Sequence, residues 1–463
     1  MSITPLGGVF ALLLVMAAAS PSPDARARTK RVGVAAAISF PFYDSAALTI
    51  GPFGVAPHYL GIIALILLAA TFRSPGTPTT RGEVLCLLLA GISVLTTAAS
   101  PWLFSGLSVL ASGTGLDEQV RFQSQLTYSA SNVAQVMYLA VNLILVTFVL
   151  KRLGIGRDVI RVALTTGTFA GGMAAAATLL GANYPHELFD TNPRFFYAEL
   201  DTRLRGHLSE PSHLGAFSLT ALAFFTVSAL TQSSAGNRLR DILMASVAAL
   251  TLYLSEAGTA VLGAAVGGSL LLAAATIRTL STGRLSLPGF VAISLGTGIA
   301  LFLSQPGYDF VSNILASKQG SMSLTTRSFA DLHALELTAQ TYGLGVGLGS
   351  NRASSMLAML ASTIGVVGVC TFVGLCYLAL RNGMRARNLA EMAALTALLT
   401  ASFISIADFT SPILWTLIGT GLHANAGLDH TRGRTGGAIA DRGSPIGHRD
   451  RLSAAQRATR RTD

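Results

Sequence analysis

Residues 242–277 read ILMASVAALTLYLSEAGTAVLGAAVGGSLLLAAATI, a run of 36 residues with one charged side chain, Glu256. As a single helix this run would be about 54 Å long, whereas the hydrocarbon core of a bilayer is only about 30 Å thick. We therefore predict a helical hairpin that crosses the membrane twice. Its turn is placed at Ser255, Glu256, Ala257 and Gly258.

Apolar runs of similar character recur along the whole chain of 463 residues. Of these residues 51% are hydrophobic and 12% are charged, and the mean hydropathy is +0.57. Helices satisfy their own backbone hydrogen bonds in lipid, and the sequence lacks the alternation typical of a closed β-barrel. We predict an all-α, polytopic helical membrane domain over residues 1–426 with about 12–13 transmembrane helices. The spans are placed near 4–20, 32–50, 55–72, 84–103, 133–150, 162–180, 214–232, 242–255, 257–277, 288–304, 354–380, 392–407 and 411–426.

The distribution of Lys and Arg predicts which loops face the cytoplasm. Of the 32 basic residues, 17 fall in six short loops, 8 fall in the tail 427–463, and the opposite loops hold 7. The net charge of +10 therefore indicates membrane topology and not nucleic-acid binding. The tail is expected to be disordered, with anionic membrane lipid as a further partner. Three larger outer loops are predicted at 104–132, 181–213 and 305–353, and the six short loops are 21–31, 73–83, 151–161, 233–241, 278–287 and 381–391.

The first apolar segment has two interpretations. Residues 6–19 resemble the core of a secretory signal, because small residues follow them. No positive charge precedes the segment, however, and four basic residues come shortly after it. This order favours an uncleaved helix inserted with its N-terminus outside over a cleaved signal.

Several chemistries have no motif in this chain. The sequence contains neither a GxxxxGK[ST] phosphate loop nor an HExxH zinc motif, so nucleotide hydrolysis and zinc proteolysis are not predicted. The three cysteines all fall inside apolar spans, where they are most simply small core residues. We expect no metal and no cofactor.

Charged residues gather in two of the outer loops, where the flanking runs are apolar. Arg203, Arg205 and Glu210 lead into the span near 214, and Arg327 lies in the loop 305–353. Guanidinium groups offer a fixed fork of donors that matches phosphate oxygens, so this pattern suits a lipid-linked phosphate or pyrophosphate. The simpler alternative is that these charges stay solvated or pair locally, as Arg327 and Asp331 would at i, i+4 on a helix.

Three stretches resemble the O-antigen polymerase and ligase-like family of bacterial membrane proteins. RLRGHLSEPSHLG at 203–215 is similar to the family segment Arg-x-x-Gly-x-x-x-Glu-Pro-Ser. A second similarity runs from Arg327 to GVGLGSNRASS at 345–355 and the following MLAMLASTIGVVG. A third is SNVAQVMYLAVNLILV at 131–146. The similarity covers most of the chain, and it implies a helical fold like that of the C-type glycosyltransferases, in the bacterial inner membrane.

The resemblance also implies a reaction and roles for particular residues. The donor would be a glycan on undecaprenyl pyrophosphate, and the enzyme would be a metal-independent glycosyltransferase. By similarity, Arg203 and Arg327 would hold the pyrophosphate as the glycosidic bond breaks. Glu210 would assist the acceptor hydroxyl. The further candidates for substrate binding are Arg205 as a supporting charge, His333 as a less favoured base, and Arg194 and Asn351 in the same outer loops.

One departure from the family pattern separates its two branches. The ligases carry a His, a small polar residue, nine variable positions and Gly-x-x-Gly, whereas this chain has Ser354 at the position of that His, followed by Ser355, with Gly365 and Gly368 at the same spacing. A serine is not basic near neutral pH, so we prefer a polymerase of O-antigen or exopolysaccharide repeat units, with a chain-length regulator as a candidate partner. The alternatives are an O-antigen ligase and a transporter or flippase of lipid-linked glycan, although the sequence shows no repeat between its halves.

Overall fold

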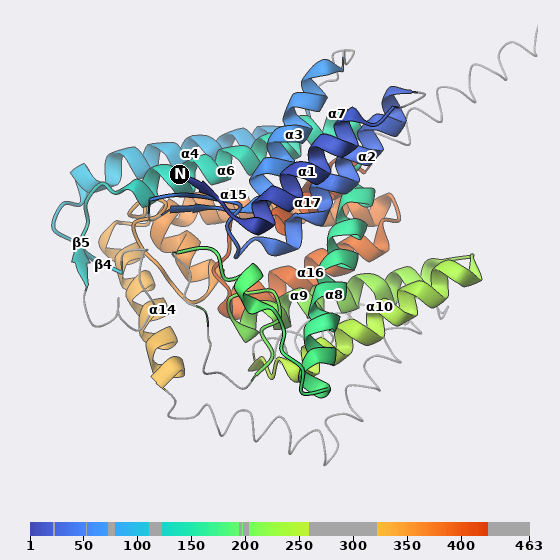
Figure 1. Ribbon diagram of the computed structural model, residues 1–463. Helices are drawn as coiled ribbons and strands as arrows, with labels where there is room; N and C mark the ends of the chain where they lie inside the picture. Colours follow the sequence, from blue (N-terminus) through green and yellow to red (C-terminus); the bar gives the residue numbers. More distant parts are fainter. Residues whose placement is uncertain are drawn as a thin grey trace, which may run out of the picture.

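The computed structural model describes residues 1–21, 24–51, 53–72, 79–110, 123–193, 197, 203–258 and 322–424. The described chain is mostly helical (Figure 1). Its main helices are α1 (Pro5–Ala19), α2 (Ala25–Ile38), α3 (Pro57–Thr71), α4 (Arg81–Leu103), α6 (Ala130–Ile144), α7 (Lys151–Leu153), α8 (Gly156–Leu179), α9 (Pro211–Thr231), α10 (Ala235–Leu254), α14 (Met322–Gln340), α15 (Met356–Arg385), α16 (Leu389–Ser405) and α17 (Pro412–Leu422). Short 3-10 turns lie at η1 (Phe40–Phe42) and η3 (His186–Leu188), and a π-helical turn, η2 (Leu145–Leu150), joins α6 to α7.

Five helical segments of the described chain are long and apolar enough to cross a membrane. They are Arg81–Leu103, Ala130–Leu153, Gly156–Leu179, Pro211–Thr231 and Met356–Arg385. The shorter apolar helices α3, α16 and α17 pack beside them, and α1 packs against α2 and α3. This composition is that of a helical membrane protein.

Most predicted spans coincide with helices, but the span predicted at 32–50 is wrong. Helix α2 ends at Ile38, and Pro41 sits in the 3-10 turn that follows. The chain then forms β2 (Leu48–Ile50) and β3 (Phe53–Val55), and with β1 (Ser2–Ile3) these make a small antiparallel sheet of order β1-β2-β3. A proline in the run removes a backbone donor and breaks the helix, which apolar composition alone does not reveal.

The first arm of the predicted hairpin is present as α10, and the hairpin as a whole stays a prediction. Helix α10 ends at Leu254, and Glu256 has a left-handed backbone with φ of 44°. The second arm, the span predicted at 288–304 and the tail 427–463 lie outside the described residues.

Helix α9 lies in the middle of the core. It packs against α10 on one side and α16 on another, while α15 packs against α4, α14 and α17. Figure 1 shows α9 and α16 running together beneath α17. Large apolar side chains such as Phe224, Phe225 and Trp415 are fully buried in this core.

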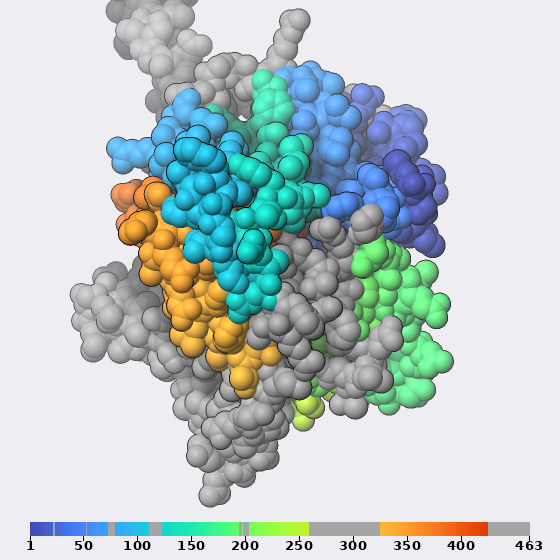
Figure 2. Space-filling view, turned by 90° about the vertical axis from the view of Figure 1, so that its left-hand side faces the viewer, coloured from blue at the N-terminus to red at the C-terminus, as the bar shows by residue number. Residues whose placement is uncertain are grey.

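The face in Figure 2 brings distant parts of the chain together. Parts of α4 and the strand pair β4 (Ser108–Val109) and β5 (Ser124–Gln125) lie beside α14. Helix α14 follows them in the sequence by about 200 residues. A contact of 3.1 Å between His333 Nε2 and the Ser108 carbonyl oxygen joins the two. The short β4–β5 pair was not predicted from the sequence.

Ion pairs connect five of the loops predicted to be cytoplasmic. Each pair joins residues of different loops: Lys30 to Asp158 at 3.8 Å, Lys151 to Glu83 at 2.6 Å, Arg157 to Glu391 at 3.0 Å, and Arg161 to Asp241 at 3.0 Å. These five loops therefore meet at one end of the helices, as a shared membrane face requires. The sixth, 278–287, is outside the described residues.

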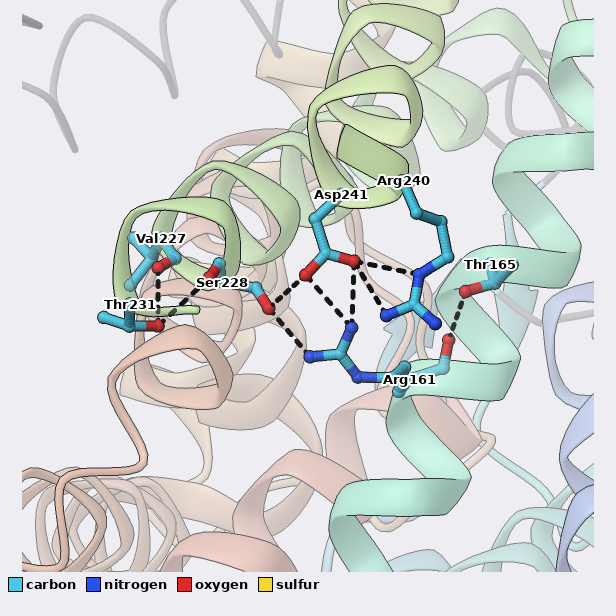
Figure 3. A network of polar contacts seen from close by, with 7 residues as sticks. All are labelled: Arg161, Thr165, Val227, Ser228, Thr231, Arg240 and Asp241. Carbon is cyan, nitrogen blue, oxygen red and sulfur yellow. Dashed lines mark hydrogen bonds and ion pairs between the residues drawn. The ribbon is translucent and has the colours of Figure 1, made fainter. Parts of the chain in front are cut away.

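The strongest of these connections is centred on Asp241 (Figure 3). Its carboxylate is fully buried and accepts from Arg161 at 3.0 and 3.2 Å, from Arg240 at 3.1 Å and from the Ser228 hydroxyl at 2.5 Å. Arg161 also donates to the Ser228 hydroxyl at 2.7 Å. A buried charge with these partners fixes α8, α9 and α10 to one another.

Candidate functional site

Glu210 is the residue on which helix α9 begins. Its backbone is extended, with φ of −134° and ψ of 150°, and Pro211 occupies the first helical position. A proline there needs no backbone donor, and it disfavours a helical conformation in the residue before it. The sequence Glu-Pro therefore places the glutamate at the edge of the helix and leaves its carboxylate free to face another element.

That element is α14. Arg327 Nη2 lies 3.5 Å from Glu210 Oε2, and Arg327 Nη1 donates to the Ser405 hydroxyl at 2.7 Å. Both members of the pair are partly exposed, at 31% for the arginine and 34% for the glutamate side chain. The two charges, predicted from separate outer loops, are thus brought together.

The surroundings of Glu210 keep it ionised. Burial alone would raise the pKa of Glu210, but His213, Arg327 and Arg352 and a hydrogen bond from Ser212 lower it below its usual value. The Ser212 hydroxyl donates to Glu210 Oε2 at 3.0 Å. The cluster around this carboxylate therefore has one glutamate and two arginines.

Arg352 reaches this cluster because of the glycine-rich loop that precedes it. The loop packs its backbone against a break in α15, where Gly365 has φ of 72°, and Val346 N donates to the Ser362 carbonyl at 2.7 Å. Gly347 has φ of 90°, and a Cβ on it would lie 2.8 Å from Thr97 Cα. The backbones approach each other closely here, and only glycine fits such positions.

Two predicted motifs meet at this loop. Asn132, from the third family-like stretch, donates through Nδ2 to the Leu348 carbonyl and to the Ser350 hydroxyl, both at 2.7 Å. Asn351 is buried, its Oδ1 accepts from Leu110 N at 3.0 Å, and its Nδ2 donates to the Ser362 hydroxyl at 3.1 Å. These contacts hold the loop in place. A direct substrate contact of Asn351 stays a prediction.

Arg205 is engaged away from Glu210. It forms a two-point ion pair with Asp190, at 2.8 and 2.6 Å, and its guanidinium lies 5.6 Å from the Tyr197 ring centroid. Only 7% of the side chain is exposed. In this position Arg205 braces the loop 181–213, and its role as a supporting charge remains a prediction.

A role beside Glu210 stays a prediction for the remaining residues, Arg203, Arg194 and His333. Arg203 lies in the described loop before α9 and is partly buried. Arg194 lies outside the described residues. His333, on α14, stacks on Phe329 at 6.0 Å and faces Ser108.

Ser354 lies just before α15. Its backbone N and that of Ser355 donate to Asp331 Oδ1 at 2.7 and 2.9 Å. The N-cap of α15 is Ser355, whose hydroxyl accepts from Ala358 N at 3.4 Å. Asp331 binds the backbone just before this helix and is not simply a surface partner for Arg327. The position at which the ligases carry their histidine therefore lies at the start of a helix in this protein.

Two further residues near Glu210, Asp44 and His213, were not predicted from the sequence as site residues. Asp44 is buried, and its Oδ2 lies 2.9 Å from His213 Nδ1. Burial alone would raise the pKa of Asp44, but His213 and the hydrogen bonds from His213 and Ser209 lower it. A lone aspartate inside an apolar run was the available signal. Its partner could not be read from local sequence.

No group of three or more His, Cys, Asp or Glu side chains within the described ranges could hold a metal ion. Comparison of the chain with protein-family models and with curated proteins finds no match.

Proposed function

We propose that the protein is a polymerase that joins oligosaccharide repeat units carried on undecaprenyl pyrophosphate at the outer face of the bacterial inner membrane. The observation that carries this proposal is the pair of Glu210 and Arg327, 3.5 Å apart, with Arg352 close by. Two guanidinium groups next to one carboxylate leave positive charge for an anionic group to neutralise. A pyrophosphate between lipid and sugar has the required charge and oxygens.

In the proposed reaction the acceptor hydroxyl attacks the anomeric carbon of the donor. The bond between that carbon and the phosphate oxygen breaks, and the lipid pyrophosphate leaves with the electron pair. Arg327 binds the oxygens that gain charge, with Arg203 as its predicted partner. The ionised Glu210 accepts the hydroxyl proton as the new glycosidic bond forms.

The site also favours the polymerase over the ligase. The ligase alternative requires a basic side chain at position 354, whereas this chain has a serine whose backbone N is bonded to Asp331. A chain-length regulator and membrane lipid are the proposed partners. The specific repeat unit, from an O-antigen or an exopolysaccharide, is left open.

The test replaces Glu210 in a strain that lacks the native gene. Glu210→Gln keeps the shape of the side chain and removes its charge, and general acid–base groups typically contribute about 10²–10⁴-fold. Gel profiles of surface polysaccharide should lose their ladder of joined units, with the protein level on a blot unchanged. Glu187→Gln is the matched control, because Glu187 is an exposed glutamate of the same loop.

The outcomes separate the rival functions. A normal ladder from Glu210→Gln would contradict the proposal. Lipid-linked units that build up on the cytoplasmic side in this variant would instead support a flippase.

A further inference from the structure

The buried carboxylate of Asp44 receives three hydrogen bonds on one oxygen. Oδ2 accepts from Ser209 N at 2.9 Å, from the Ser209 hydroxyl at 2.6 Å and from His213 Nδ1 at 2.9 Å. Only 1% of Asp44 is exposed. An ionised carboxylate is stable at such a position when donors like these replace its water.

The donors lie on both sides of Glu210 in sequence. Ser209 directly precedes it, and His213 follows in the first turn of α9. Pro211 restricts the backbone between them. One carboxylate thus fixes the two ends of the five-residue segment on which Glu210 is carried, and the direction of the Glu210 side chain depends on it.

Asp44 is itself held by the outer loop before α9. The Tyr197 hydroxyl donates to the Asp44 carbonyl oxygen at 3.1 Å. Two residues later, Ala46 N donates to the Thr191 hydroxyl oxygen at 2.9 Å, and that hydroxyl donates to the Ala46 carbonyl at 3.0 Å. The segment that carries Asp44 is therefore a rigid support, anchored at several points.

We propose that Asp44 is a positioning residue for the glycosyl transfer: through Ser209 and His213 it holds the Glu210 carboxylate opposite Arg327. The inference rests on the proposed function for the identity of the reaction. Asp44 does not touch the substrate, and His213 acts here through Nδ1, which faces Asp44. Loss of the contact between Asp44 and His213 should therefore displace the Glu210 carboxylate and leave the affinity for the substrate unchanged.

The first experiment replaces His213 by two amides that imitate different ring nitrogens. The amide of Asn falls near Nδ1 and can still donate to Asp44, whereas that of Gln falls near Nε2. With purified protein and a lipid-linked repeat unit, His213→Asn should keep most of kcat. His213→Gln, His213→Ala and Asp44→Asn should lose kcat on the order of 10²-fold, with KM for the donor changed by less than about threefold, as expected when a reacting group is displaced.

Two results would overturn the positioning role. One is that His213→Asn is no better than His213→Ala, since the hydrogen bond to Asp44 would then be irrelevant. The other is that the variants raise KM and leave kcat intact, which would make His213 a substrate-binding residue. If Asp44→Asn does not accumulate, Ser209→Ala removes just one of the three bonds and should give a smaller loss of kcat.

A second measurement does not depend on the reaction. The melting temperatures in detergent of Glu210→Gln, Arg327→Gln and the double variant give the coupling of this pair. The single shifts should be non-additive in the wild-type background and additive once Asp44→Asn is present. An inactive wild-type protein would contradict the proposed function alone. A coupling between Glu210 and Arg327 that Asp44→Asn leaves unchanged would contradict the positioning role alone.

Discussion

Arg327 holds Glu210 with one end of its guanidinium fork and Ser405 with the other. The distances are 3.5 Å from Nη2 to the carboxylate and 2.7 Å from Nη1 to the hydroxyl. The three residues come from α14, the start of α9 and the end of α16. A single planar side chain therefore sets the distance between three elements at the proposed site.

We expect Arg327→Lys to reduce the amount of polymer formed at least tenfold, while the protein still inserts into the membrane. Lysine keeps the charge, but it offers a single ammonium group in place of the fork and cannot reach both partners in one plane. The measurement is the polysaccharide ladder on gels, normalised to the protein level. Arg238→Lys, at the opposite end of the molecule, should have no effect. Full ladders from Arg327→Lys would mean that charge alone suffices.

The sequence was a good guide to most helices, for a local reason. Runs of apolar residues and the Glu-Pro step are short-range signals, and α9 begins at Pro211 as these signals predict. The contact of Asp44 with His213 depends on how α2, η1 and the loop before α9 fold over one another. No periodicity or spacing encodes such a pairing across the chain.

The failure at 32–50 has a related cause. This stretch is as apolar as a span, yet its second half is a 3-10 turn and the strand β2. Apolar composition shows only that a segment prefers an apolar environment to water. The interior of a protein is such an environment, as is lipid. Asp44 within the run is instead paired with His213 and Ser209 in the protein interior.

Topology can be checked by cysteine labelling. In a background without Cys86, Cys370 and Cys376, a cysteine at Tyr342, which is 89% exposed beyond the end of α14, should react with an impermeant maleimide from outside. A cysteine at Ser233, in one of the basic loops, should react only after the membrane is opened. The reverse pattern would place Arg327 in the cytoplasm and remove the proposed site from its substrate.

The contact of Asp331 with the backbone before α15 gives a test of polymerase against ligase. Asp331→Ala removes the acceptor for Ser354 N and Ser355 N and leaves two backbone donors without it, so we expect a loss of about 1–3 kcal/mol in the free energy of unfolding. Ser354→Ala leaves both backbone bonds in place and should change neither stability nor polymer length by much. Unfolding in detergent and gel profiles measure the two effects. If Ser354→Ala abolished the product while the protein kept its normal stability, Ser354 would be catalytic. That result would favour the ligase over the polymerase.

His207 should make the fold sensitive to acid. The ring is buried among Phe42, Phe217 and Phe189, with centroid distances of 5.2, 5.8 and 6.4 Å. Burial lowers the pKa of His207 from 6.5 to about 4, although Asp44 and the Pro41 backbone oppose the shift.

Between these values the unfolded chain binds a proton that the folded chain excludes, so stability falls as the pH is lowered from about 6.5 to 4, by about 3 kcal/mol in all. His207→Phe retains an aromatic ring in the cluster and removes the titration. Its free energy of unfolding in detergent should therefore decline less than that of the wild type over this interval, and the difference between the two should be constant above pH 7. Parallel curves from pH 7 to 4 would show that the ring is protonated in the folded protein, and that the aromatic cluster does not exclude the charge.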